Sequence, residues 1–401
     1  MKQLSSKPAR GTQDLLPEDM KLRNWVISKI TEVYTSRGYT QIETPIIENI
    51  ENLTASEGGE NLRMLFKILK RGEKLDLKNI KSEDDLTDLG LRFDLTLPLS
   101  RFYSNNLNEL IRPFKAFQLG NVFRAERNQK GRYRQFVQCD IDTLGDSSYF
   151  AETDLLITVP EALYNIGFKN FTIKINDRRI LKELVLKSGF EEDDFGTICI
   201  TADKLDKIGR EGVIAELKDK GYDETKAQKL LENLNIPLSE IEGEYAEQMC
   251  QIINTVKNYY PIEFDSTLVR GMGYYTGPIF EIVSGDFNSS IAGGGRYDGL
   301  LNKFTKESIP AVGFSIGFER VISILKEQGF KVPTQKTEYA VLFADEKLYG
   351  LALKFADERI KEGNIASIYK IKPNRIGKEV ATFKKAGYET LVIDEINKNE
   401  N

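Results

Sequence analysis

The sequence predicts an α+β protein in which antiparallel strands are followed by a helix-rich insertion and then by a small α/β domain. The first observation is a pair of extended runs, FKAFQLGNVFRAE and RQFVQCDIDTLG, which flank a polar loop and predict a long antiparallel hairpin. The second is the helical, charged pattern of residues from about 180 to 250. The third is an alternation of apolar runs and helical patterns after Lys336, which predicts a βαβαβ unit with a parallel sheet.

Two domains account for the length of the chain. Its 401 residues exceed one ordinary core, and a helix stop followed by a proline near residues 329–336 marks a boundary. We therefore predict a first domain over residues 1–330, with the insertion at about 180–250, and a second over residues 337–401. No run approaches the roughly 20 apolar residues of a membrane span, and the polar N-terminus lacks a secretory signal. We expect a cytoplasmic protein with no membrane partner.

The N-terminal part predicts one helix and two strands. Apolar residues recur at helical spacing from Leu22 to Val33, and Gly38 ends the predicted helix. The run IETPIIE then has the composition of a strand. In LRFDLTLPL, polar and apolar residues alternate, and this period of two predicts a strand with Asp94 and Thr96 on one face.

The second strand of the hairpin has one polar face. Alternation places an aromatic ring and three polar side chains together on it: Phe136, Gln138, Asp140 and Asp142. Such a face is a poor core and is typical of the floor of a ligand site. The same alternation places Arg124 and Glu126 together on the first strand.

In the second domain, three strands are predicted at YAVLFA, IASIYKI and TLVI, with a helix in each interval. The first helix carries an apolar stripe of Leu348, Leu351, Phe355 and Ile360. The second carries Ile376, Val380 and Phe383. This order is typical of a parallel sheet whose helices connect neighbouring strands.

Composition excludes several kinds of chemistry. The chain contains no histidine, so Ser/His/Asp, Cys/His and HExxH sites are excluded. Three cysteines far apart in the sequence argue against a disulfide framework and against a cysteine-based zinc site. A net charge of −5 argues against a broadly basic nucleic-acid binder, although local basic runs occur at residues 67–74, 127–134 and 370–385. Any catalysis is expected to depend on charge and positioning.

Four segments combine arginine with glycine: FRAERNQKGRYRQF, LVRGMGYYTGPIFE, AGGGRYDGL and AVGFSIGFER. Arginine offers a permanent charge and a planar donor fork for phosphate, and glycine lets a ligand approach the backbone closely. Taken singly, the triglycine is equally typical of a turn, and GFSIGFER of a helix start. No GxxxxGK[ST] loop is present. Arg124, Arg270 and Arg320 come from separate segments and could together surround a triphosphate.

In combination, the motifs resemble the class II aminoacyl-tRNA synthetases and, within them, the histidyl-tRNA synthetase family. KPARGTQDLLP is similar to the N-terminal motif of that family, and GYTQIETPIIE to motif 1, which contains Pro45. FRAE with GRYRQF resembles motif 2, and AVGFSIGFER resembles motif 3. LVRGMGYYTGPIFE and AGGGRYDGL resemble its two histidine-specific motifs. Gly273 stands where the family usually has aspartate, and the C-terminal domain is shorter than usual.

The resemblance implies an antiparallel catalytic sheet flanked by helices, in a class II synthetase-like domain, and a shortened anticodon-binding-like C-terminal domain. It implies a homodimer with Pro45 at the interface. It also implies that ATP, accompanied by Mg²⁺, activates L-histidine, which is then transferred to tRNA(His). No metal-binding motif of the protein itself is implied.

The resemblance also implies roles for individual residues. At the nucleotide, Arg124 and Arg270 would contact the α-phosphate and Arg320 the γ-phosphate, while Phe136 and Arg320 would sandwich the adenine near Glu126. At the amino acid, Asp94, Thr96 and Gln138 would hold the ammonium group, and Tyr275 and Asp142 would face the imidazole. Three further residues of the same motifs would belong to the histidine pocket: Tyr274, Gly293 and Gly294.

Two alternatives remain at this point. One is the histidine-binding regulatory subunit of ATP phosphoribosyltransferase, a synthetase-like protein that does not aminoacylate tRNA. The other is a ligase that activates histidine for an acceptor other than tRNA. The presence of Arg124, Arg270, Arg320 and a C-terminal βαβαβ unit favours a tRNA ligase.

Overall fold

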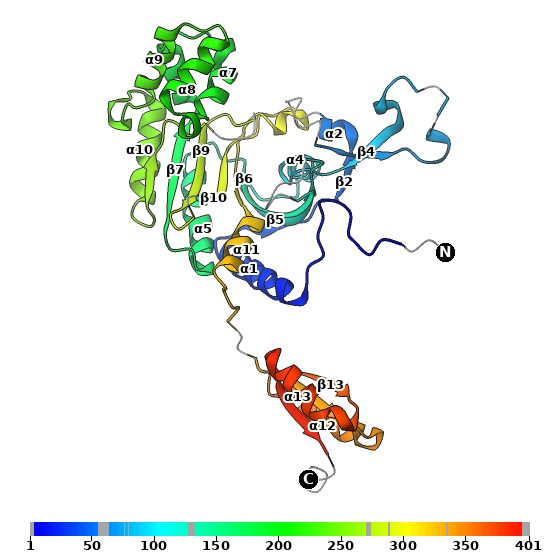
Figure 1. Cartoon of the computed structure of the whole chain (residues 1–401). Helices are drawn as coiled ribbons and strands as arrows, with labels where there is room; N and C mark the ends of the chain where they lie inside the picture. Colours follow the sequence, from blue (N-terminus) through cyan, green and yellow to red (C-terminus); the bar gives the residue numbers. More distant parts are fainter. Residues whose placement is uncertain are drawn as a thin grey trace. The chain divides into compact units, whose positions relative to one another are not determined.

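The computed structural model describes residues 4–54, 64–75, 77–78, 80–126, 133–269, 274–287, 289–333 and 336–394, with the backbone alone for Asp206. It divides the chain into two units, Met1–Phe330 and Lys331–Asn401. Figure 1 shows their elements. Short 3-10 helices lie between the main elements: η1 Gly72–Lys74, η2 Glu83–Leu86, η3 Glu192–Asp194, η4 Leu238–Glu240, η5 Leu301–Lys303, η6 Glu346–Leu348 and η7 Pro373–Arg375.

An eight-stranded sheet forms the centre of the first unit. Its strands, in spatial order, are β1 Thr40–Gln41, β5 Phe114–Phe123, β6 Gln135–Leu144, β11 Ala311–Ile316, β10 Ser289–Arg296, β9 Pro278–Ser284, β7 Phe171–Asp177 and β8 Ile262–Phe264. The inner pairs are antiparallel, and only the edge pairs β1–β5 and β7–β8 are parallel. The predicted hairpin is confirmed, because Phe114 pairs with Leu144 and Phe123 with Gln135.

Three helices pack together with one face of this sheet: α1 Pro17–Ser36, α5 Phe150–Ile166 and α11 Phe318–Glu327. The apolar stripe of α1 is buried, with Val26, Ile30 and Tyr34 fully covered. The Tyr34 ring meets the edge of Phe117 on β5 at a centroid distance of 5.7 Å. Phe117 pairs with Ile141 of β6, so the apolar face of the hairpin faces α1. The polar face of β6 is left for a cavity on the other side.

The segment around Asp94 corrects the predicted strand. Strand β4 ends at Leu91, and helix α4 Thr96–Asn105 begins two residues after Asp94. Pro98 fits the first helical turn, where a missing N–H costs no hydrogen bond, and the Asp94 carboxylate accepts from the N–H of Leu97 at 3.3 Å. Every residue from 92 to 100 is buried, so the alternation of residue types does not report one exposed face. Asp94 and Thr96 share a helix start.

The run IETPIIE also differs from the predicted single strand. The run begins directly after β1, and only its last two residues belong to β2 Ile47–Asn49, a strand of another sheet. Pro45 stands between the two strands without an N–H to donate. Strand β2 pairs with β4 Thr87–Leu91, which pairs in turn with β3 Phe66–Leu69, and α2 Ile50–Thr54 follows β2.

Five helices form the insertion between β7 and β8: α6 Arg178–Lys187, α7 Phe195–Ala202, α8 Leu205–Asp219, α9 Glu224–Asn233 and α10 Glu244–Val256. They gather at the β7 end of the sheet (Figure 1). Their apolar faces supply a core of their own, which includes Leu184, Val213 and Leu230. Helix α8 contains a break at Gly209, where φ is 69°.

The second unit is a three-stranded parallel sheet with two helices, as predicted. Its elements are β12 Glu338–Phe343, α12 Tyr349–Lys361, β13 Ile365–Lys370, α13 Ile376–Lys385 and β14 Glu389–Ile393, with β12 in the centre. Leu348, Leu351 and Phe355 pack on its core. Ile360 does not complete that stripe, because it lies near the end of α12 and is 51% exposed. In the part of the chain that the structure describes, no helix is both long and apolar enough to cross a membrane.

The contact between α1 and the hairpin predicts a large effect of Phe117→Ala. Removing this fully buried ring leaves a cavity beneath Tyr34, and we expect the free energy of unfolding to fall by about 3–5 kcal/mol. Urea unfolding followed by the fluorescence of Trp25, the only tryptophan, measures this loss. Phe150→Ala is the control, because Phe150 is 63% exposed and its removal should cost about 0.5 kcal/mol or less. Equal losses in the two variants would contradict the packing described.

Candidate functional site

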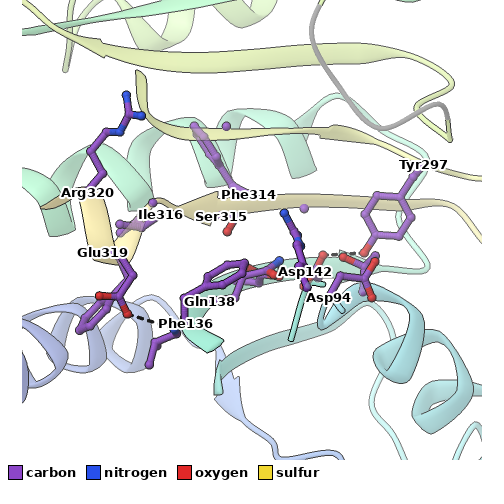
Figure 2. Close-up of a pocket in the computed structure, with 18 of the residues that line it drawn as sticks. Asp94, Phe136, Gln138, Asp142, Tyr297, Phe314, Ser315, Ile316, Glu319 and Arg320 are labelled. Carbon is purple, nitrogen blue, oxygen red and sulfur yellow. Dashed lines mark hydrogen bonds between the residues drawn. The ribbon is translucent and has the colours of Figure 1, made fainter. Parts of the chain in front are cut away.

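A cavity of about 340 Å³ opens over the polar face of β6. Its walls come from β6, β10, β11, the start of α4, the segment at Tyr274 and Tyr275, and the first turn of α11. Ten of the residues predicted from the sequence line it: Asp94, Thr96, Arg124, Phe136, Gln138, Asp142, Tyr274, Tyr275, Gly293 and Arg320. Figure 2 shows Arg320 and Phe136 at one end of the cavity and Asp94, Asp142 and Tyr297 at the other.

The Asp142 carboxylate is held by a tyrosine that was not among the residues predicted from the sequence. The Tyr297 hydroxyl donates to Asp142 Oδ1 at 2.5 Å. Asp142 Oδ2 is buried and accepts no hydrogen bond from the described residues. The only sequence cue to Tyr297 was its position in AGGGRYDGL, where we selected the glycines instead.

Gly313 makes room for the same carboxylate. It lies directly opposite Asp142 across the β6–β11 pair, and a Cβ added to it would stand 2.0 Å from Asp142 Oδ1. Any side chain at this position would therefore displace the carboxylate. Gly294 has a related packing role, because a Cβ there would lie 2.2 Å from the Gly313 carbonyl oxygen. Gly294 is thus placed within the sheet, whereas Gly293 lines the cavity.

Gln138 and Asp140 form a second polar pair on the floor. Gln138 Nε2 donates to Asp140 Oδ2 at 2.7 Å, which leaves Gln138 Oε1 directed away from that bond. Gln138 Oε1 is buried and receives no hydrogen bond within the described ranges. Alternation placed Asp140 on this face, but the sequence offered no basis for giving it a role.

Burial raises the pKa of three carboxyl groups in this cavity. The pKa of Asp94 is raised to about 6 and that of Asp140 to about 7, in both cases chiefly by loss of solvation. The pKa of Asp142 is also raised, first by burial and then by the negative charge of Asp140, against the opposing effect of the Tyr297 hydrogen bond. A ligand that brings positive charge to this end would favour the ionised carboxylates.

Three aromatic rings close the acidic end of the cavity. Tyr274 meets Tyr275 edge-on at 5.0 Å and Tyr297 at 5.9 Å between ring centroids. A Cβ at Gly295 would stand 3.0 Å from Tyr275 Cδ1, so the glycine lets this ring lie against strand β10. Asp140 and Asp142, which line the same cavity, are buried.

The other end of the cavity is basic and aromatic. The Arg124 guanidinium lies 5.0 Å from the centroid of the Phe136 ring, and its Nε donates to the Phe93 carbonyl oxygen at 2.9 Å. Arg320 extends from the first turn of α11 and is exposed (Figure 2). Arg270 and Gly273 lie outside the described residues.

Arg296, the arginine of AGGGRYDGL, serves another purpose. Its Nε and Nη2 donate to the two carboxylate oxygens of Glu152 at 2.5 and 2.8 Å, and its Nη1 donates to Asp298. The Arg296 and Glu152 side chains are 6% and 1% exposed. This buried pair anchors the end of β10 that carries Tyr297, and Arg296 does not line the cavity.

Two predicted residues lie elsewhere in the structure. Glu126 follows the end of β5 and is not among the residues that line the cavity. Pro45 is exposed between β1 and β2. Among the described residues, no group of three or more cysteine, aspartate or glutamate side chains is arranged to hold a metal ion. The cavity as a whole has an acidic, hydrogen-bonding end and, opposite it, a basic and aromatic end that suits an aromatic anion.

Comparison with known proteins identifies the family of the chain. The family model for histidyl-tRNA synthetase matches residues 11–321. The histidine–tRNA ligase of Leifsonia xyli subsp. xyli is 42% identical over 344 residues, which cover 80% of each chain. That of Christiangramia forsetii is 34% identical over 439 residues, covering 98% of this chain and 94% of the relative. The crystal structure of histidyl-tRNA synthetase from Nostoc sp. PCC 7120 has a TM-score of 0.80 at 26% identity, covering 99% and 94%. The chain belongs to the histidyl-tRNA synthetase family, within the class II aminoacyl-tRNA synthetases.

Proposed function

We propose that this protein is a histidine–tRNA ligase that activates L-histidine with ATP to histidyl-adenylate and transfers the histidyl group to tRNA(His). The observation that carries this proposal is a cavity over the polar face of β6. One end of this cavity is acidic, and the other is lined by an aromatic ring and arginines. Family membership supports the use of ATP. The same proposal includes a cytoplasmic location.

The acidic end would bind histidine. The ammonium group would lie near Asp94, Thr96 and the Gln138 Oε1 atom, and the imidazole would lie between Tyr275 and Asp142. Gln138 Oε1 and Asp142 Oδ2 support this placement, because both are buried acceptors without a donor from the described residues. Tyr274 and Gly293 would complete the pocket. A side chain that cannot donate would leave these acceptors unpaired, which disfavours it by about 10⁴-fold.

The other end would bind ATP. Phe136 and Arg320 would enclose the adenine, with Glu126 nearby, and Arg320 would also reach the γ-phosphate. Arg124 and Arg270 would face the α-phosphate, where negative charge develops. Mg²⁺ would enter with the nucleotide and neutralise phosphate charge, since the described residues form no metal cluster of their own.

The activation step requires no protein base. The carboxylate of histidine is ionised at neutral pH, and its oxygen attacks the α-phosphorus of ATP, so that the acyl–phosphate bond forms as pyrophosphate leaves. The protein supplies alignment and positive charge, which suits a chain without histidine. In the transfer step a terminal ribose hydroxyl of the tRNA attacks the acyl carbon, the acyl–phosphate bond breaks, and AMP leaves with its phosphate able to take the hydroxyl proton.

A homodimer and an RNA-binding second unit belong to the same proposal. Pro45 is exposed. So are two apolar residues of the three-stranded sheet β2–β4–β3, Ile47 at 52% and Leu69 at 56%. An apolar surface of this kind suits a second copy of the chain. Residues 337–401 would act as an anticodon-binding-like domain. Sedimentation of the whole chain and footprinting of a tRNA(His) transcript measure these two properties.

One assay separates this function from its alternatives. Histidine-dependent exchange of pyrophosphate into ATP is measured first, and charging of a tRNA(His) transcript second. A regulatory subunit of ATP phosphoribosyltransferase would show neither activity. A ligase with a different acceptor would show exchange without charging. We expect both activities.

Gly313→Ala is expected to weaken histidine binding selectively. The new methyl group would displace the Asp142 carboxylate, so the KM for histidine in the exchange assay should rise by about 100-fold, while the KM for ATP changes little. Gly299→Ala is the matched control, because a Cβ there would meet no described atom within 4 Å. Equal KM values for histidine in the two variants would argue against the assigned position of Asp142.

Asp140→Asn is expected to act in opposite directions on stability and on binding. The raised pKa, about 7, means that the folded protein binds more protons than the unfolded chain between about pH 4 and pH 7. The stability that this group contributes therefore falls as the pH rises. The variant should be more stable than the wild type at pH 8 and similar at pH 4.5, in urea unfolding without ligand.

Asp140→Asn should weaken histidine binding at pH 8, although it makes the unliganded protein more stable at that pH. At pH 8 the variant lacks the ionised Asp140 carboxylate, which holds Gln138 next to the proposed place of the ammonium, and its KM for histidine should rise by about tenfold. At pH 5.5 the wild-type carboxyl is mostly neutral, so the two KM values should converge. Because the imidazole of histidine titrates equally in both assays, a pH-independent ratio of KM values would contradict this role.

A further inference from the structure

A buried ion pair joins the first helix of the chain to the residue before Arg320. Arg23 of α1 donates from Nη1 and Nη2 to the two carboxylate oxygens of Glu319, each at 2.7 Å. The two side chains are 6% and 12% exposed. The Arg23 guanidinium also lies 4.8 Å from the centroid of the Phe318 ring. A two-pronged bond of this kind fixes orientation as well as distance.

The same carboxylate also holds strand β6. Pairing between β6 and β11 ends at Cys139 and Ile316. Val137 lies two residues before Cys139 in β6, and its N–H donates to Glu319 Oε1 at 3.1 Å, a bond drawn in Figure 2. Val137 directly follows Phe136, and Glu319 directly precedes Arg320. Glu319 therefore connects the two backbone segments that carry the sides of the nucleotide end.

We propose that Arg23 is a positioning residue for the nucleotide: through Glu319 it fixes the separation of Phe136 and Arg320. This inference rests on the proposed binding of ATP between those two side chains. Arg23 itself does not line the cavity. Without it, the Glu319 carboxylate would be left with only the Val137 N–H, and it would turn toward water and away from β6.

The chain offers a matched control on the same two helices. Lys326 of α11 pairs with Asp19 of α1 at 2.5 Å, and its side chain is 53% exposed. Trp25 of α1 also packs against Phe330, three residues after the end of α11, with ring centroids 4.9 Å apart. Replacing either cation by methionine removes one ion pair between α1 and α11, but only Arg23→Met releases Glu319.

The test compares the whole wild-type chain with Arg23→Met, Arg23→Lys and Lys326→Met. In pyrophosphate exchange, Arg23→Met should raise the KM for ATP by about tenfold and leave the KM for histidine within about twofold. Lys326→Met should match the wild type. Arg23→Lys keeps the charge but loses the two-pronged bond, so its KM for ATP should lie between those of the wild type and Arg23→Met. If Arg23→Met fails to fold, the comparison of Arg23→Lys with the wild type tests the inference.

Two outcomes would overturn the inference. One is an unchanged KM for ATP in both Arg23 variants. The other is a parallel rise of both KM values with a lower urea midpoint, which a purely structural role would produce. Titration calorimetry with ATP separates the inference from the proposed function. A wild-type chain that binds ATP without exchange refutes the ligase function, and the variants are then compared by their Kd for ATP. A wild-type chain that binds no ATP refutes both.

Discussion

The burial of three carboxyl groups on one side of a cavity is the constraint around which the site is built. Asp94, Asp140 and Asp142 lose solvation there, and loss of solvation is the largest cause of the raised pKa of each. Protein groups satisfy some of their oxygens: the Leu97 N–H, the Gln138 amide and the Tyr297 hydroxyl. Oδ1 of Asp140 and Oδ2 of Asp142 are buried without a hydrogen-bond partner among the described residues, and both side chains line the cavity. The unliganded protein is thus less stable than it would be with neutral residues there, and a cationic ligand offsets that cost.

Close approach between strands makes this burial possible. Gly313 stands opposite Asp142 and leaves the space that its carboxylate occupies. At the end of β10, Arg296 is saturated by Glu152 and its neighbours and so fixes the strand that carries Tyr297. Breaking such a buried pair costs about 3–5 kcal/mol, because one charge is left without a partner. The Arg296–Glu152 pair and the Asp142 carboxylate are therefore linked through the backbone of β10, because Tyr297 directly follows Arg296.

Sequence patterns predicted the fold wherever one face of an element meets water or a cavity. Strand β6 is such a case, because its polar face lines the cavity while Ile141 faces the helices. The patterns failed where the chain is buried on every side. The segment around Asp94 alternates like a strand, yet Pro98 and the Asp94 carboxylate start a helix. IETPIIE fails for another reason: the run is mostly exposed, and only its last two residues, after Pro45, belong to strand β2.

The sequence by itself determined which chemistries are available: with no histidine, the chain must act through arginine charge, carboxylates and positioning. It also determined the order of the elements and the face of β6 that meets the cavity. Only the tertiary structure decided the partners. It paired Arg296 with Glu152, and it brought Tyr297 to Asp142 and Arg23 to Glu319. The reason is physical: local spacing specifies the direction of a side chain along its own strand or helix, whereas a partner more than a hundred residues away is specified by how the elements pack.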